Sequence, residues 1–217
     1  YYIISPDGSR MLIQTKTKAI YRHSFTATYY IYSIRNNKLE PLSDGGPQQT
    51  PVFSPDGNQI AFVRDNNIWL VKLLYDNAES QVTTDGKFNE VINGIPDWVY
   101  EEEFSTNCSM VFSADSKQII WIRYDESAVK QYSMQIFNGL NPERSEYAEY
   151  PGDYTYKYPV PGQVNSKVSV HSYDIQSHQT RKINVPLDAD GYIPRIKATS
   201  DPAKGAVMTM NRHQDVP

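Results

Sequence analysis

The chain has 217 residues with a formal net charge of −4, and its length permits one or two domains with a sizeable core. A mildly acidic chain without basic clusters argues against a nucleic-acid partner. No apolar run approaches the roughly 20 residues that a membrane-spanning helix needs, and the single cysteine, Cys108, excludes an internal disulfide.

One turn motif recurs along the chain. Residues 5–8 and 54–57 both read Ser-Pro-Asp-Gly, residues 113–116 read Ser-Ala-Asp-Ser, and an apolar run follows each copy. Proline presets φ at the second position of such a turn and glycine closes it. The copies begin 49 and 59 residues apart, close to the roughly 40–50 residues of a β-propeller blade. The repeat predicts an all-β chain that forms part of a propeller. Three ordinary hairpins of a sandwich are the alternative.

The segments between these turns predict the remaining strands. At about 45 residues per four-stranded blade, the chain supplies roughly four to five blades, and we expect no long helix. A fourth, degenerate copy of the turn begins at Ser200. The other expected features are a strand at 29–32 with a turn at 36–37, a hairpin of 61–64 and 68–71 about a turn at 65–67, and strands at 167–173 and 180–185.

Three acids, Glu101, Glu102 and Glu103, follow one another among aromatic residues. The segment reads Asn-Gly-Ile-Pro-Asp-Trp-Val-Tyr-Glu-Glu-Glu-Phe from residue 93 to residue 104. Consecutive carboxylates repel, and aromatic neighbours lower the local dielectric and strengthen that repulsion. We therefore expect a positive group nearby: an arginine, a metal or a cationic ligand. An exposed acidic helix is the alternative interpretation.

The local pattern also limits how these acids can act together. Pro96 and Asp97 favour a short helical turn that opens here, because proline suits a first helical position and aspartate a cap. Adjacent helical residues point about 100° apart. Two of the acids can converge on one ligand while the third faces elsewhere.

This segment resembles the double-glutamate motif of the dipeptidyl peptidase IV family of serine exopeptidases. In that family the second and third acids bind the free N-terminal ammonium of a peptide substrate, so the resemblance assigns this role to Glu102 and Glu103. Glu101 is then the acid expected to face away and to tolerate a change to Gln. Residues 22–27, Arg-His-Ser-Phe-Thr-Ala, resemble the segment around the arginine that grips the first peptide carbonyl. That role falls on Arg22, which also supplies a counter-charge for the acids.

The stretch from Phe137 to Ser166 breaks the strand rhythm. It is rich in tyrosine and proline, and an insert of this length inside a compact domain usually carries function. Family members have a projecting arm at the matching place, although Val160-Pro161 stands where Lys-Ala is expected. The resemblance therefore implies a projecting insert at about 137–166 that mediates a homodimer, and a mobile surface loop is the alternative.

Several kinds of site have no motif in the sequence. We find no Gly-x-Ser-x-Gly elbow, no His-Glu-x-x-His pair among the four histidines and no glycine-rich phosphate loop. We therefore expect no catalytic nucleophile in this chain, no metal site and no cofactor.

The resemblance implies that residues 1–217 are part of the N-terminal propeller of a longer enzyme. The family propeller has eight blades, and a C-terminal α/β-hydrolase domain, absent here, carries the Ser-Asp-His triad. The parent would release N-terminal dipeptides with Pro or Ala as second residue from peptides with a free N-terminus. Family members work mostly in the periplasm or outside the cell, in part membrane-associated, and some are cytoplasmic. A tripeptidyl peptidase of the same family and a non-enzymatic protein-binding propeller are the alternatives.

Overall fold

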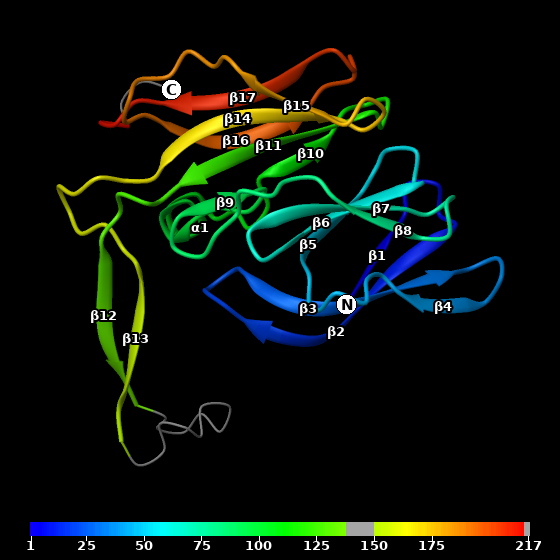
Figure 1. The fold of residues 1–217 in the computed structure, drawn as a ribbon, viewed down its shortest axis with the longest axis horizontal. Coiled ribbons are helices and arrows are strands. Elements are labelled where there is room, and N and C mark those ends of the chain that lie inside the picture. Colours follow the sequence, from blue (N-terminus) through cyan, green and yellow to red (C-terminus); the bar gives the residue numbers. More distant parts are fainter. Residues whose placement is uncertain (138–149, 215–217) are drawn as a thin grey trace.

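The computed structural model describes residues 1–137 and 150–214 and consists almost wholly of antiparallel strands (Figure 1). The first sheet, in the order β1-β2-β3-β4, contains Tyr2–Ile4, Arg10–Ala19, Phe25–Ser33 and Lys38–Pro41. The second, β5-β6-β7-β8, contains Gln49–Phe53, Gln59–Arg64, Asn67–Lys72 and Ala78–Gln81. The third, β10-β11-β14-β15, contains Met110–Phe112, Gln118–Asp125, Lys167–Asp174 and Gln179–Ile183, and β9 (Val91–Asn93) joins it by pairing with β11.

Two further pairs of strands complete the fold. β16 (Tyr192–Ala198) and β17 (Gly205–Met210) form a hairpin beside the third sheet, and the expected degenerate turn at Ser200 lies between them. β12 (Gln131–Ile136) and β13 (Gly152–Lys157) form a second hairpin. α1 (Trp98–Phe104) is the one helix in the described part of the chain, where no helix is long and apolar enough to cross a membrane.

The recurring turns join the first two strands of each sheet and share one hydrogen-bond pattern. In the second copy the Ser54 hydroxyl donates to Asp56 Oδ1 at 2.5 Å and accepts from the amide of Gln59 at 3.0 Å, while the amide of Gly57 donates to the Ser54 carbonyl at 2.9 Å. The first and third copies repeat these contacts. The fourth residue of the turn has a positive φ, +71° at Gly57, which explains the glycine.

The sheets face one another and bury their apolar side chains between them. Along β6, Ile60 and Phe62 pack into a core shared with the first sheet, whereas Ala61 and Val63 pack into a core shared with the third. Because successive strand residues point to opposite faces, this continuous apolar run supplies two cores at once. That arrangement of facing blades confirms the all-β partial propeller.

The described residues form three four-stranded blades and the first two strands of a fourth, fewer than the four to five that the repeat length suggested. Two excursions account for the difference. One lies between β9 and β10 and contains α1, and the other is the β12–β13 hairpin, inserted between β11 and β14. The repeat estimate counted both as blade residues.

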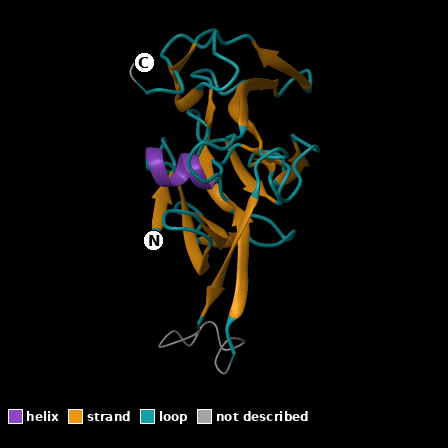
Figure 2. Ribbon diagram, turned by 90° about the vertical axis from the view of Figure 1, so that its left-hand side faces the viewer, coloured by secondary structure: helices purple, strands orange, loops and turns teal. Residues whose placement is uncertain are grey.

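The β12–β13 hairpin extends away from the blades (Figures 1 and 2). The insert was expected at 137–166 without strand alternation, and both parts of that expectation need correction. The projecting element begins at Gln131, and Gly152–Lys157 is a regular strand paired with it from Gln131↔Lys157 to Ile136↔Gly152. The part of the expected insert at 138–149 lies outside the described residues.

The edge strand of the third blade is divided into β9 and β10, and the segment that contains α1 connects them. β9 pairs with one end of β11, through Asn93↔Arg123, and β10 pairs with the rest, starting at Met110↔Trp121. Residues 94–109 leave the sheet between them. Their ends meet again, because the Ser109 amide donates to the Gly94 carbonyl at 2.8 Å.

Gly94 and Ser109, where the two ends of this segment meet, form a neck, and position 94 requires glycine. Gly94 has φ +78°, and a Cβ there would lie 3.0 Å from the side chain of Ile68 and 3.2 Å from that of Val63. Both neighbours are fully buried. The sheet and the packing together therefore fix the point from which the segment carrying the acids departs.

Candidate functional site

Helix α1 is short, and contacts outside it hold it in place. The carboxylate of Asp97 caps its start by accepting from the amide of Tyr100 at 2.9 Å, and its other oxygen accepts from the Ser166 hydroxyl at 2.5 Å. Burial raises the pKa of Asp97 above its ordinary value, against the effect of these hydrogen bonds. The fully buried Tyr100 accepts from the amide of Ile193 at 3.1 Å. Seven residues alone would not form a stable helix, so these contacts determine where the acids lie.

Glu101 is buried and binds the loop that presents Arg22. One carboxylate oxygen accepts from the amides of His23 at 2.7 Å and Ser24 at 2.8 Å. The three acids have different surroundings, because Glu101 binds this loop, Glu102 pairs with Arg22 and Glu103 is exposed. Glu101 is clamped to the backbone rather than solvated, which argues against the expected tolerance of this acid to substitution.

Arg22 and Glu102 come together across 80 residues of sequence. Arg22 Nε lies 2.9 Å from Glu102 Oε1 and 3.0 Å from Oε2. Within the described chain, the two terminal nitrogens of the guanidinium make no hydrogen bond, and the arginine side chain is 69% exposed. A carboxylate and a cation with free donors are thus presented side by side to solvent.

Aromatic rings form the walls of a hollow of about 340 Å³ around this pair. The ring of Trp98 lies 4.4 Å from that of Tyr158 and 5.8 Å from that of Tyr156, centroid to centroid, and Tyr21 lies 5.7 Å from Tyr156. The base of the β12–β13 hairpin therefore builds one side of the hollow. The residues that line it are Ile20, Tyr21, Arg22, Trp98, Glu102, Tyr154 and Tyr156.

Glu103, the third residue predicted for this site, lies apart from the other two. It is exposed and does not line the hollow, and within residues 1–137 and 150–214 its carboxylate makes no hydrogen bond or ion pair. The helix turns it away from Glu102, as the 100° step between adjacent residues requires. Of the predicted residues, the structure thus joins Arg22 with Glu102 and places Glu103 on the neighbouring face.

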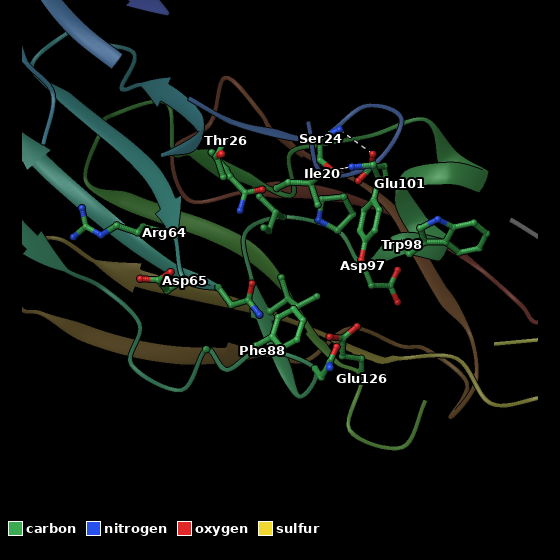
Figure 3. Close-up of a pocket in the computed structure, with 18 of the residues that line it drawn as sticks. Ile20, Ser24, Thr26, Arg64, Asp65, Phe88, Asp97, Trp98, Glu101 and Glu126 are labelled. Carbon is green, nitrogen blue, oxygen red and sulfur yellow. Dashed lines mark hydrogen bonds between the residues drawn. The ribbon is translucent and has the colours of Figure 1, made fainter. Parts of the chain in front are cut away.

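A larger cavity, of about 570 Å³, adjoins this hollow and shares Tyr21 and Trp98 with it. Figure 3 shows this larger cavity. The first turn of α1, the loops that end the first two blades, and Phe88 enclose it, and Glu101 and Asp97 line its helix side. Glu126, directly after β11, is only 6% exposed and points into this space. Burial, with the nearby Asp97, raises the pKa of Glu126 to about 7, while Lys157 opposes the shift.

Sequence reasoning missed the tyrosines of the hollow and the buried acid. The tyrosines carried a readable signal, because Tyr154, Tyr156 and Tyr158 recur every second residue, as on one face of a strand. No such signal marks Glu126, whose Asp-Glu-Ser context is typical of a surface turn. Its burial depends on segments that are distant in sequence.

Comparison with known proteins gives consistent results. The model of the family described as "Dipeptidyl peptidase IV (DPP IV) N-terminal region" matches residues 5–216. A probable dipeptidyl-aminopeptidase B of Emericella nidulans is 37% identical over 222 residues, which cover 98% of this chain and 24% of that protein. A protein of the same name from Talaromyces marneffei is 34% identical over 98% of this chain and 24% of its own length.

Two solved structures extend the comparison. The crystal structure of Porphyromonas gingivalis dipeptidyl peptidase 4 matches with a TM-score of 0.90 and 46% identity, over 99% of this chain and 29% of that one. A putative dipeptidyl aminopeptidase IV from Bacteroides ovatus matches with a TM-score of 0.65 at 20% identity, over 95% of this chain and 25% of that one, a likeness of fold alone. The chain spans about a quarter of the length of the curated relatives it matches.

Proposed function

Because the chain belongs to the family of dipeptidyl peptidase IV N-terminal regions, we propose that it anchors the N-terminus of peptide substrates in a serine exopeptidase that releases dipeptides. The names of its relatives support this reaction. The relatives are about four times as long as this chain, and residues 1–217 contain no Gly-x-Ser-x-Gly elbow. We therefore assign the serine nucleophile to a part of the parent protein outside these residues.

The pairing of Arg22 with Glu102 in an aromatic hollow carries the proposal. A carboxylate binds an ammonium through charge-assisted hydrogen bonds, and the faces of Trp98 and the tyrosines add cation–π attraction. In this proposal Glu102 takes the substrate ammonium directly. Glu103 joins it only after its side chain turns toward the hollow.

Arg22 has a second role in the proposal. Its Nε is engaged by Glu102, while its two terminal nitrogens have no hydrogen-bond partner in the described structure. These donors suit the first carbonyl oxygen of a peptide whose ammonium lies against Glu102. The guanidinium of Arg22 thus orients both the Glu102 carboxylate and the backbone of the substrate.

Anchoring the ammonium also explains why dipeptides are the product. Two extended residues span about 7 Å, so acids fixed at that distance from a nucleophile permit cleavage only after the second residue. We propose Pro or Ala at that position, selected by a pocket outside this chain. The propeller then excludes peptides whose N-terminus is blocked.

The test uses the full-length protein with Glu102→Gln and a matched control, Glu40→Gln, whose acid pairs with Lys38 at the edge of the first blade. Losing one partner of a desolvated charge pair costs about 2–5 kcal/mol, so kcat/KM on a free-amine X-Pro anilide should fall roughly thirty-fold to a few thousand-fold. The control should stay near wild type. On the N-acetylated substrate, which has no charge to bind, Glu102→Gln should cause little further loss. Equal losses on both substrates, or a mild loss on the free amine, would refute the anchoring role.

We also propose that the β12–β13 hairpin mediates self-association of the parent protein. All but the last residue of β12 are exposed, and large apolar side chains lie uncovered along the hairpin at Tyr132, Met134, Phe137 and Tyr150. Exposed aromatic residues on a projecting element are typical of an interface. The far ends of its two strands, Ile136 and Gly152, also lie away from the blades (Figure 1), so contact there need not cover the hollow.

A further inference from the structure

The larger cavity beside α1 contains an acid that the proposed anchoring does not use. Its volume, about 570 Å³, falls within the range of small-molecule sites. Glu126 is nearly fully buried there, and its carboxylate makes no hydrogen bond or ion pair with any residue of the described chain. In Figure 3 this carboxylate points into the cavity beside Phe88 and faces the side lined by Asp97.

The neighbouring groups leave Glu126 without a partner. Asp97 is an acid already engaged by Ser166 and the helix cap. The amino group of Lys157 donates to the carbonyls of Val129 at 2.7 Å and Ser127 at 3.4 Å, so its hydrogen bonds go to the backbone. An ionised carboxylate that is buried without a partner is unfavourable, and the raised pKa of Glu126 reflects this. The two other cations that line the cavity are paired elsewhere, Arg64 with Glu79 and Lys87 with Glu90. The position beside Glu126 therefore favours a cation.

The cavity adjoins the hollow that we assign to the substrate ammonium. Ile20, Tyr21 and Trp98 line both spaces. A ligand anchored at Glu102 therefore lies next to this cavity. Trp98 and Tyr21 provide the apolar surface along which the methylenes of a long basic side chain can pack.

We propose that the cavity binds the side chain of the first substrate residue when it is Lys or Arg, with Glu126 as the anion that receives the charge. The inference rests on the proposed anchoring of the ammonium at Glu102. It assigns Glu126 to substrate selection, and it predicts a preference for peptides that begin with a basic residue. Phe88, at the rim, and Trp98, at the wall, flank the aliphatic part of that side chain.

The test compares two substrates of the full-length protein, Lys-Pro and norleucine-Pro anilides, which differ in the side-chain charge. Wild type should cleave the lysine substrate with a kcat/KM about tenfold higher than that of the norleucine substrate. This gain lies between the effect expected of an exposed charge pair and that of a buried one. Glu126→Gln should reduce that ratio to about one, because only the lysine substrate loses a charged partner. The matched control is Glu40→Gln, whose acid pairs with Lys38 at the edge of the first blade, away from the cavity, and it should keep the wild-type ratio.

A binding measurement separates this inference from the function on which it rests. Calorimetry with the dipeptides Lys-Pro and norleucine-Pro needs no turnover, and thermal unfolding confirms that the variants are folded. If no X-Pro substrate is cleaved but Lys-Pro binds more tightly in a way that depends on Glu126, the proposed reaction is wrong and the basic subsite stands. If wild type shows no lysine preference in binding or turnover, or if Glu126→Gln keeps it, the inference is overturned.

Discussion

Replacing Glu101 tests whether this acid holds the loop that presents Arg22. Its carboxylate oxygen accepts two backbone amides. Each charge-assisted hydrogen bond contributes about 1.5–3 kcal/mol and a neutral one about 0.5–1.5. Glu101→Gln keeps an oxygen in place and should weaken the attachment of the loop by about 2 kcal/mol over the two bonds.

Glu101→Ala removes the acceptor altogether. Leaving two buried donors unpaired costs about 1–3 kcal/mol each, but His23 is exposed and the loop can move out to water. We therefore expect a loss near the lower limit, about 2–3 kcal/mol. Because the loop carries Arg22, the detached state also loses the ion pair with Glu102, and kcat/KM on free-amine substrates should fall with it.

Native-state hydrogen exchange at the amides of His23 and Ser24 measures this attachment directly. A loss of about 2 kcal/mol corresponds to roughly thirty-fold faster exchange, and the effect of Ala should exceed that of Gln. Glu103→Gln is the matched control, because it removes a charge on the same helix from an exposed carboxylate that makes no hydrogen bond or ion pair within the described residues. Unchanged exchange in Glu101→Ala would show that the loop holds its position without Glu101 and would refute the reasoning.

Three other predictions concern the neck, the buried acid and the hairpin. Gly94→Ala combines a positive φ with a Cβ at 3.0 Å from Ile68. It should therefore lower the free energy of unfolding, measured with urea, by about 1–3 kcal/mol and reduce kcat/KM. No change in either quantity would mean that the backbone at Gly94 adapts without cost. The pKa of Glu126 is raised from 4.5 to about 7 in the folded protein, so the folded state binds more protons between these values and stability falls as pH rises through them. Urea unfolding should therefore show wild type losing about 2 kcal/mol from pH 5 to pH 8 relative to Glu126→Gln, and parallel profiles would contradict the burial argument. Replacing the residues between Ile136 and Gly152 by a short turn should give a folded monomer of the full-length protein by light scattering, whereas a persistent dimer would exclude the hairpin tip as the interface.

The blades could be predicted because their signals are local. The Ser-Pro-Asp-Gly turns specify a positive φ and a serine–aspartate hydrogen bond within five residues, and both are present at Ser54 and Gly57. The hairpin at 65–67 likewise follows from Asp65 and Asn66, whose φ values of +51° and +60° suit a tight turn between two strands.

The candidate site was predicted only in part because it is assembled from distant segments. The resemblance identified Arg22 and Glu102, and the structure brings them into contact. The orientation of the acids depends on the clamp between Glu101 and the Arg22 loop, and on hydrogen bonds from Ser166 and Ile193 to the helix. None of these partners lies within a range over which local patterns are informative. The same holds for Glu126, whose burial comes from segments of all three blades.

The closed neck at Gly94 and Ser109 separates the strands of the third blade from the segment that contains α1. Both residues pair with the same neighbour, since the Gly94 amide donates to the Ile122 carbonyl at 3.2 Å and the Ile122 amide donates to the Ser109 carbonyl at 2.9 Å. For β11, the partner strand is therefore continuous whether or not fourteen residues intervene between Gly94 and Ser109. Lengthening or exchanging that segment changes the loop-closure entropy only slowly and leaves the sheet register untouched. The register of the blade is thus independent of the excursion, whereas the packing is not, because Ile95 and Tyr100 lie in the same core as Tyr124 and Ile193. The exposed positions of the acidic helix can therefore vary more freely than the strands of the blade.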